Sequence, residues 1–167
     1  IHKLQEEASS APPQLIGVRI IDNICTLSVD SSGTLLYRRG YRLATAKAPI
    51  RETLAAGMVL ASGWDRKSPL LDPFCGAGTI AIEAAMMARG MKPGKARYFA
   101  FMYWPNYSSE MWGEVLREKE KISRGPFPVI LASDRDAGAI KAAEENARRA
   151  GMAEFISFSC QSFSAIE

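Results

Sequence analysis

The most constraining feature of the sequence is a short apolar run that leads into a helical pattern through two closely spaced glycines. In order, the pattern predicts a buried strand over Pro69–Leu71, a tight turn over Asp72–Gly78 and a helix over Thr79–Arg89. Gly76 and Gly78 lack a Cβ, so the backbone can turn sharply there and a ligand can approach it closely. The segment therefore predicts a ligand-binding turn at a helix N-terminus, with a purely structural strand-to-helix connection as the alternative.

Strands and helices continue to alternate after this segment. The sequence predicts a second strand over Val129–Ala132, a helix over Ala137–Ala150 and a third strand over Phe155–Phe158. Such alternation is typical of βαβ units that build a parallel sheet. The expected fold is α/β and Rossmann-like, represented by its first three parallel strands, with ligands beyond the carboxyl ends of those strands.

The N-terminal part is predicted to be of a different kind. Residues 1–14 are polar and contain prolines, so we expect a linker. Three β-prone runs, Leu15–Ile21, Asn23–Asp30 and Leu35–Tyr37, predict a small antiparallel β meander before the α/β part. A helix is expected over residues 49–63, because a proline suits its first turn and a glycine its end.

A long irregular stretch, residues 91–128, separates the glycine-turn helix from the second strand. Its charged part predicts a helix over Ser109–Lys121. Its aromatic part, Phe99–Trp104, has the apolar density of a long loop that packs onto the sheet as part of the core, and stacking on nucleobases is the alternative.

Acidic residues close two of the predicted strands. Asp72 follows the first strand, where it could accept a hydrogen bond from a ligand ammonium or hydroxyl group. Asp134 ends the second strand, where a carboxylate can accept from both hydroxyls of a ribose. The alternative for Asp134 is to cap the next helix, but Asp136 is better placed for capping. Asp134 is therefore predicted to bind the ligand.

Two other nucleotide-binding patterns also contain closely spaced glycines. Gly76–Ala81 fits the dinucleotide pattern G-x-G-x-x-A, but that pattern expects an acidic residue about 20 positions downstream. No strand-end acid stands there, since Glu83 comes too early and lies inside the helix. Glu83 itself could reach the ligand site, and a neutral solvated or capping role is the alternative. A P-loop is excluded, because no Gly-Lys-Ser or Gly-Lys-Thr follows.

The composition narrows the class of protein further. The net charge of +3 permits a nucleic-acid partner without requiring one. Three widely spaced cysteines and a single histidine argue against a metal site, and unpaired cysteines indicate the reducing cytoplasm. No apolar run reaches the roughly 18 residues that a membrane helix needs.

A basic strip precedes the first predicted helix. It contains Arg38, Arg39, Arg42, Lys47 and Arg51. Such a strip is suited to contacting the phosphates of RNA, and a solvated edge of the protein is the alternative.

Taken together, these segments resemble one family. Asp72–Thr79 is similar to the first motif of class I methyltransferases in its Asp-Pro-Phe-x-Gly-x-Gly-Thr form, which is typical of enzymes that act on amino groups of nucleobases. Further matching segments are Arg39–Arg42, Ala48–Ala56, Ser62–Trp64, Ser133–Asp136 and Asn146–Gly151. The combined set resembles the THUMP-associated rRNA guanine-N2 methyltransferases of the large ribosomal subunit.

The resemblance implies the cofactor S-adenosyl-L-methionine and roles for the site residues. Asp72 and the Phe74–Gly78 turn would bind the methionine end, Asp134 the ribose, and Arg135 would lie at the edge of the adenine pocket. The implied cofactor-binding residues are Asp72, Pro73, Phe74, Cys75, Gly76, Ala77, Gly78, Thr79, Asp134 and Arg135.

The resemblance also implies an RNA partner, which Arg38, Arg39 and Arg42 would contact. The expected RNA is rRNA, with tRNA guanine-N2 methylation as the alternative and a nicotinamide-dependent oxidoreductase as the candidate from a different class. An RNA-binding THUMP domain would come first. Residues 1–45 would then be the connecting linker and meander, and residues 46–167 the N-terminal part of the methyltransferase domain.

Two departures from the family pattern affect the chemistry. The family places an acid near the adenine amino group after the third strand, where this sequence has Cys160-Gln161-Ser162, so Gln161 or Ser162 would have to substitute. The catalytic Asn-Pro-Pro-Tyr motif follows the fourth strand, and this sequence stops at Glu167 before it. We expect no catalytic residue and no activity in this chain alone, because methyl transfer requires the amine to be held in line with the sulfonium.

Overall fold

The computed structural model describes residues 13–43, 50–95, 97–117 and 126–166. The chain divides into two compact units. One contains the residues up to Leu36 together with Tyr98–Glu114, and the other contains Tyr37–Arg97 and Val115–Glu167. The α/β unit thus includes the chain from Tyr37 onward, and Tyr98–Glu114 of the long irregular stretch belongs with the N-terminal residues.

The α/β unit is built on a parallel sheet, as predicted. Its strands are β3 (Leu70–Asp72), β4 (Ile130–Asp134) and β5 (Ser157–Cys160), in the order β3-β4-β5. Asp72 pairs in register with Ala132, and Asp134 pairs with Cys160. The strands therefore end close together at one edge of the sheet, and this edge is where a ligand binds in such folds.

Three helices belong to this unit, α1 (Glu52–Ala61), α2 (Thr79–Ala88) and α4 (Ala137–Arg149). α2 is apolar on nearly all sides, and for that reason most of its residues are buried. Asp136 caps α4 as predicted, since its side chain accepts hydrogen bonds from the amides of Gly138 and Ala139 at 2.7 and 3.3 Å. In the described part of the chain, no helix is long and apolar enough to cross a membrane.

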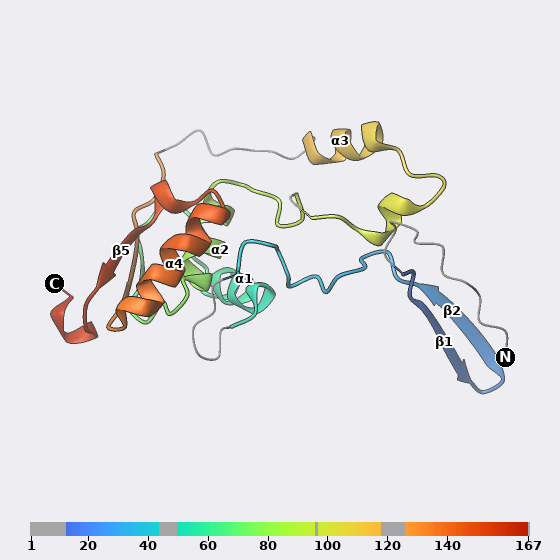
Figure 1. Ribbon diagram of the computed structural model, residues 1–167, viewed down its shortest axis with the longest axis horizontal. Helices are drawn as coiled ribbons and strands as arrows, with labels where there is room; N and C mark the ends of the chain where they lie inside the picture. The colour runs from blue at the N-terminus through green and yellow to red at the C-terminus, as the bar shows by residue number, and fades with distance from the viewer. Residues whose placement is uncertain (1–12, 44–49, 96, 118–125, 167) are drawn as a thin grey trace. The chain divides into compact units, whose positions relative to one another are not determined.

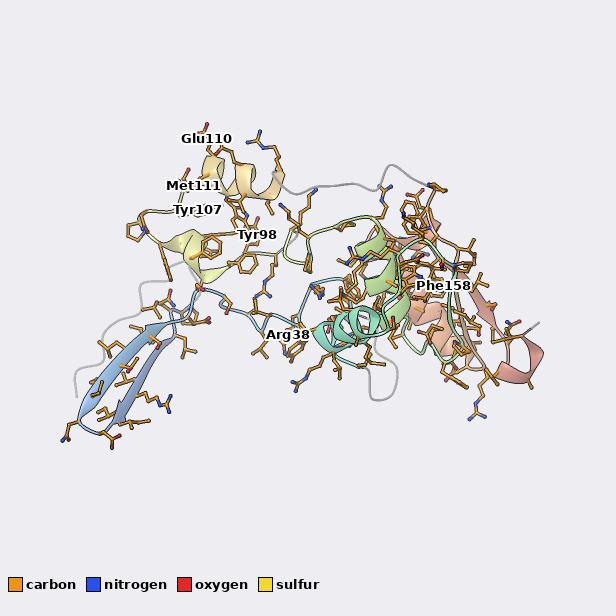
Figure 2. All side chains as sticks on the ribbon, turned by 180° about the vertical axis from the view of Figure 1, so that it is seen from behind. Arg38, Tyr98, Tyr107, Glu110, Met111 and Phe158 are labelled. Atoms are coloured by element: carbon orange, nitrogen blue, oxygen red, sulfur yellow. The ribbon has the colours of Figure 1, made fainter. Side chains whose placement is uncertain are left out.

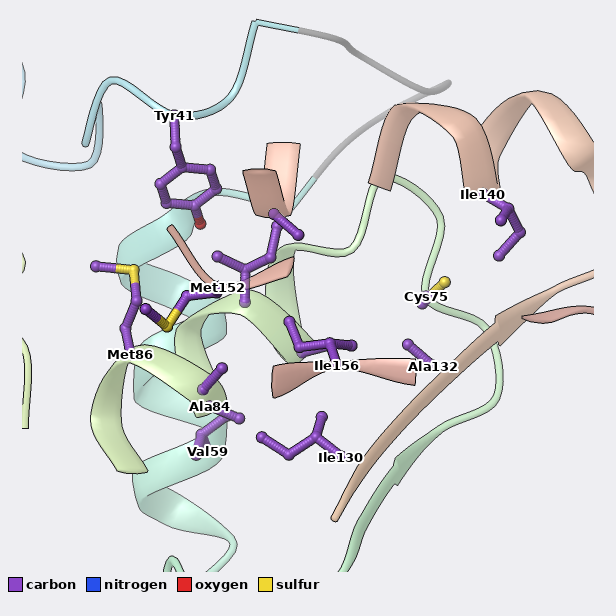
Figure 3. Close-up of a cluster of buried hydrophobic side chains, with 14 residues drawn as sticks. Tyr41, Val59, Cys75, Ala84, Met86, Ile130, Ala132, Ile140, Met152 and Ile156 are labelled. Atoms are coloured by element: carbon purple, nitrogen blue, oxygen red, sulfur yellow. The ribbon is translucent and has the colours of Figure 1, made fainter. Parts of the chain in front are cut away.

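The hydrophobic core lies between these helices and one face of the sheet. α2 contacts β3 and β4, while α4 contacts β4 and β5 (Figure 1). Ile130 and Ala132 of β4 point into this core, which also contains Val59 of α1 and Tyr41 from the segment before it (Figure 3). Leu131 faces the other side of the sheet, because side chains alternate along a strand.

The other unit begins with an antiparallel hairpin of β1 (Ile16–Ile21) and β2 (Ile24–Val29). Asp22 and Asn23 connect the strands, and both have positive φ, as a two-residue hairpin turn requires. The side chains of both strands are exposed (Figure 2).

The predicted third strand of the meander, Leu35–Tyr37, is absent. The carboxylate of Asp30 accepts hydrogen bonds from the amides of Ser32 and Gly33, both at 3.0 Å, and so bends the chain away from β2. The carbonyl of Ser31 then accepts from the amide of Phe101 at 3.1 Å. A side-chain turn thus replaces the predicted strand pairing.

The same unit contains a cluster of aromatic residues near the short helix η1 (Ala100–Tyr103) and α3 (Ser109–Arg117). The rings of Phe99 and Phe101 are stacked with centroids 5.4 Å apart, and Trp112 lies edge-on to Phe101 at 5.2 Å. The rings therefore pack on one another and on Trp112 within this unit, whereas the prediction placed the run in the core against the parallel sheet, which belongs to the other unit. The rest of the predicted charged helix, residues 118–121, lies outside the described residues, as do the first residues of the predicted linker and Pro49.

The third parallel strand starts two residues later than predicted. A short helix, η2 (Ala153–Phe155), precedes β5, and a further one, η3 (Phe163–Ala165), follows it. The ring of Phe155 contacts the ring of Phe127, with centroids 4.5 Å apart, and lies under the guanidinium of Arg89 at 4.7 Å. These contacts hold Phe155 in a turn, although its residue type favours a strand.

Candidate cofactor-binding site

The glycine turn connects β3 to α2 in the conformation that the two glycines permit. Gly76 and Gly78 have φ values of 52° and 79°, in the left-handed region that favours glycine. The amide of Gly78 donates to the carbonyl of Cys75 at 2.8 Å, and Gly78 is the residue from which α2 begins. The turn therefore presents the N-terminus of α2 to the carboxyl edge of the sheet.

Asp134 ties this turn to the neighbouring strand. Its Oδ2 accepts a hydrogen bond from the amide of Gly76 at 3.0 Å, and its Oδ1 accepts from the amide of Asp136 at 3.0 Å. The amide of Cys75 donates to the carbonyl of Ser133 at 2.9 Å. Each carboxylate oxygen of Asp134 retains acceptor capacity, because an ionised carboxylate has about four lone-pair sites.

Asp72 lies at the end of β3 with one oxygen still unsatisfied. It is 8% exposed; Oδ1 accepts from the amide of Phe74 at 3.3 Å, and the buried Oδ2 has no hydrogen-bond partner among the described residues. Burial raises the pKa of the Asp72 carboxyl, and the nearby Asp134 raises it further, while the Phe74 amide opposes the shift. A buried, unpaired acceptor at this edge fits a cationic or hydroxylic group of a ligand.

Cys75 does not act as a nucleophile in this arrangement. Its side chain is buried, and burial raises the pKa of the thiol to about 12, with the carboxylates of Asp72 and Asp134 adding to the shift. The reactive form of cysteine is the thiolate, so this side chain stays neutral and packs within the turn.

Phe74 of the glycine turn forms an aromatic pair with Phe163, a residue to which the sequence assigned no role. The rings of Phe74 and Phe163 are stacked with centroids 5.5 Å apart, and both are largely exposed. The backbone N–H of Gln161, one of the two candidate substitutes for the missing acid, donates to the carbonyl of Asp134 at 3.0 Å. The side chain of Arg135 is exposed.

α4 packs directly on the glycine turn. A Cβ added to Gly78 would lie 2.9 Å from the Cβ of Ala143, so only glycine lets the helix come this close. Asn146, which is fully buried, donates from Nδ2 to the carbonyl of Ala77 at 3.1 Å. The sequence placed Asn146 within a matching segment but indicated no role for it, because the contact joins residues that are 69 positions apart.

The predicted RNA-contacting arginines do not form a common strip. Arg38 is exposed (Figure 2). Arg39 and Arg42 instead turn inward, where Arg39 Nε lies 2.9 Å from Oε1 of Glu83 and Arg42 Nη2 lies 3.2 Å from Oε2 of Glu52. The expectation of a phosphate-contacting strip is therefore corrected for these two residues, because buried carboxylates engage their guanidinium groups.

Glu83 is buried rather than solvated. Its side chain is 2% exposed, and Oε1 also accepts a hydrogen bond from the hydroxyl of Tyr41 at 2.8 Å. Burial raises the pKa of the Glu83 carboxyl, and Arg39 opposes the shift. Within the described residues, no group of three or more histidine, cysteine, aspartate or glutamate side chains could hold a metal ion.

The fold and this edge define the class of the protein as a Rossmann-like α/β domain with a glycine-turn site for a nucleotide-type cofactor. Comparisons with known proteins narrow the class. The sequence model of the RMKL-like methyltransferase domain family UPF0020 matches residues 39–167. The chain therefore belongs to this methyltransferase family.

Several curated relatives share one name, ribosomal RNA large subunit methyltransferase K/L. A ribosomal RNA large subunit methyltransferase K/L of Vibrio campbellii is 42% identical over 152 residues, which are 88% of this chain and 22% of the relative. Another, of Vibrio cholerae O1 El Tor, is 44% identical over 148 residues, or 86% of this chain and 21% of the relative. The chain thus spans about a fifth of the length of these relatives.

Solved structures share the fold. The SMU.472 protein is assigned as a methyltransferase and was crystallised with SAH. It matches this chain with a TM-score of 0.82 at 30% sequence identity, and the match covers 94% of this chain and 41% of SMU.472. A protein of Clostridium difficile 630 that is assigned as a methylase has a TM-score of 0.84 at 37% identity and covers 100% of this chain and 44% of its own. These likenesses confirm the Rossmann-like methyltransferase fold that the sequence predicted.

Proposed function

We propose that this chain is the cofactor-binding part of an S-adenosyl-L-methionine-dependent RNA methyltransferase. The target is an exocyclic guanine amine, N2, of large-subunit rRNA. An RNA-binding domain of the THUMP type in the same protein delivers the RNA. The relatives' names support rRNA over the alternative of tRNA. Three free cysteines support a cytoplasmic location.

One observation carries this proposal. Two strand-end carboxylates lie at the glycine turn, and they differ in burial and in hydrogen bonding. Asp72 has a buried oxygen without a partner, and Asp134 is held in place by the Gly76 amide with acceptor capacity left over. A buried carboxylate suits an amino-acid ammonium group, and an oriented carboxylate suits the hydroxyls of a ribose. The site thus has one acceptor for the methionine part of the cofactor and one for its ribose.

The described residues contribute binding and orientation. When bound, S-adenosyl-L-methionine supplies an electrophilic methyl group on a sulfonium. Asp72 would hold the ammonium of the methionine end, and that cation would offset the cost of burying the carboxylate charge. Asp134 would accept from the ribose hydroxyls. The left-handed turn at Gly76 and Gly78 lets the cofactor approach the backbone closely, and the buried Cys75 stays out of the chemistry.

Calorimetric titration of the full-length protein with S-adenosylhomocysteine, and separately with NADH, tests this assignment. We expect binding of the first ligand and none of the second. Asp134→Ala should abolish the binding, whereas the matched control Asp136→Ala should retain it. Asp136 is also an aspartate next to the site, but it caps α4, and loss of a cap costs about 1 kcal/mol of stability.

Binding of NADH alone would overturn the methyltransferase proposal in favour of the oxidoreductase. Equal loss of binding in the Asp134 and Asp136 variants would contradict the role of Asp134, because general destabilisation would then explain both. The RNA part of the proposal is tested with large-subunit rRNA and tRNA as methyl acceptors, with the methylated base identified by mass spectrometry.

A further inference from the structure

Asn146 makes a buried contact with the glycine turn that the proposed function does not use. It lies on α4 and is 0% exposed, and its Nδ2 donates to the carbonyl of Ala77 at 3.1 Å. Ala77 is the residue between the two glycines. A buried polar side chain lowers stability unless it is hydrogen-bonded, and the turn supplies the acceptor that the Asn146 amide needs.

The contact adds a second hydrogen bond to one peptide of the turn. The peptide between Ala77 and Gly78 is held on both sides, because its carbonyl accepts from Asn146 and its N–H donates to the carbonyl of Cys75 at 2.8 Å. Glycines on either side of Ala77 give the backbone many alternative conformations. An anchor from outside the turn selects one of them.

A neighbouring residue of the turn is held by the second strand-end carboxylate, Asp134. The amide of Gly76, which is the residue before Ala77, donates to Oδ2 of Asp134 at 3.0 Å. The turn is therefore anchored at Gly76 by Asp134 and at Ala77 by Asn146. Asn146 holds the turn from α4, and Asp134 holds it from the end of β4.

Surface residues of α4 fix the orientation of the Asn146 amide. Nη1 of Arg149 donates to Oδ1 of Asn146 at 3.1 Å, so the Nδ2 group must face Ala77. Nη2 of Arg149 lies 3.4 Å from Oε2 of Glu145, which holds the guanidinium in turn. Because a guanidinium only donates, Oδ1 is the atom that faces Arg149.

We propose that Asn146 is a positioning residue for the cofactor turn, through its hydrogen bond to the Ala77 carbonyl and with its amide oriented by Arg149. The inference rests on the proposed function, since the turn is taken as the cofactor site. Asn146 touches neither cofactor nor substrate in this role. It holds the backbone of the turn in the conformation that receives the cofactor.

Hydrogen exchange of the full-length protein without cofactor tests the role directly. In Asn146→Asp the side chain keeps its size and its acceptor for Arg149 but loses the donor to Ala77. We expect the amides of Gly76 and Gly78 to exchange about tenfold faster, the factor that corresponds to losing roughly one buried hydrogen bond. The affinity for S-adenosylhomocysteine should fall by about the same factor.

Two controls separate positioning from general loss of stability. Met152→Ala opens a cavity in the same hydrophobic core, and it should leave the exchange of the turn and the affinity unchanged. Arg149→Gln should speed exchange of the turn about threefold, because the Asn146 amide loses its orientation. Arg148→Gln, an exposed arginine on the same last turn of α4, should have no effect.

The exchange rates of the variants decide whether Asn146 positions the turn. Wild-type exchange of the turn in a folded Asn146→Asp variant would overturn the proposal, as would equal acceleration in Met152→Ala. If Asn146→Asp does not fold, the pair Arg149→Gln and Arg148→Gln decides, and identical exchange in the two would overturn it. Absence of S-adenosylhomocysteine binding by the wild-type protein would instead count against the proposed function, while exchange still reports on Asn146.

Discussion

Asp72 places a carboxylate where a charge is costly. Its side chain is nearly buried, one of its oxygens has no partner among the described residues, and burial raises its pKa. Folding therefore favours the protonated form. At neutral pH the ionised group destabilises the folded state, and this cost is the counterpart of a carboxylate that is ready for a cationic ligand.

This cost gives a prediction with a definite sign. Asp72→Asn should raise the melting temperature at pH 7, because it removes the buried charge. The gain should vanish below a pH of about 3.9, the ordinary pKa of aspartate, where both folded and unfolded wild-type chains hold the proton. Thermal unfolding of both proteins at pH 7 and pH 3 measures it, and the same variant should lose affinity for S-adenosylhomocysteine.

Asp65 serves as the matched control for that prediction. Hydrogen bonds from the amides of Ser68 and Lys67 lower the pKa of this exposed carboxyl, so the folded state favours the ionised form. Asp65→Asn should therefore lower the melting temperature at pH 7, which is the opposite direction. The same direction of change in both variants would contradict the assignment of a burial cost to Asp72.

The two glycines of the turn differ in what a side chain would meet. Both have positive φ, but a Cβ at Gly76 would have nothing within 4 Å, whereas one at Gly78 would clash with Ala143. Gly76→Ala should cost about 1 kcal/mol of unfolding free energy from backbone strain alone. Gly78→Ala should cost about 3 kcal/mol, because overpacking is added to the strain. Urea denaturation measures both, and equal losses would exclude the clash as a cause.

At the scale of elements, the segment before α1 is docked on two helices by buried charges. Tyr41 and Arg39 meet Glu83 of α2, and Arg42 meets Glu52 of α1. Burying ion pairs rarely adds stability, since desolvation offsets the attraction, but it specifies one arrangement of the parts. Here the arrangement joins the segment to the helix that begins at the cofactor turn.

Breaking this network from one side should be severe. Glu83→Ala leaves Arg39 and the hydroxyl of Tyr41 buried without their acceptor, so we expect a loss of about 3–5 kcal/mol in unfolding free energy. Glu145→Ala removes the partly exposed ion pair with Arg149 and should cost only about 0.3–0.5 kcal/mol. Urea denaturation compares the two variants. A small loss in Glu83→Ala would mean that Arg39 and Tyr41 reach solvent.

The elements themselves were predictable where the pattern is local. The helices α2 and α4 and the strand β4 formed where apolar spacing, an aspartate cap and closing glycines placed them. β5 started later than predicted because contacts of Phe155 with Phe127 and Arg89 outweighed its strand propensity. The third meander strand failed because the side chain of Asp30 satisfied the backbone locally.

At the scale of the molecule, the chain consists of two units that interleave in sequence. The hairpin with Tyr98–Glu114 forms one unit, and the parallel sheet with α1, α2 and α4 forms the other. A two-stranded hairpin with exposed side chains is marginal alone in water, and the hydrogen bond between Ser31 and Phe101 joins it to the aromatic cluster of its own unit. Chain order alone does not show this interleaving, because α1 and α2 lie between the hairpin and Tyr98–Glu114 in the sequence.

The class of fold and the two strand-end carboxylates followed from residues close together in the chain. A buried run, a glycine turn and a helical period are local patterns, and parallel strands necessarily end at one edge of a sheet. Tertiary structure alone decided which side chains that edge holds and which turn inward. Arg39 is charged in any sequence context, but only the fold supplies Glu83 as its partner, and only the fold brings Asn146 to Ala77. Burial and pairing depend on residues far apart in the chain, and no local pattern encodes them.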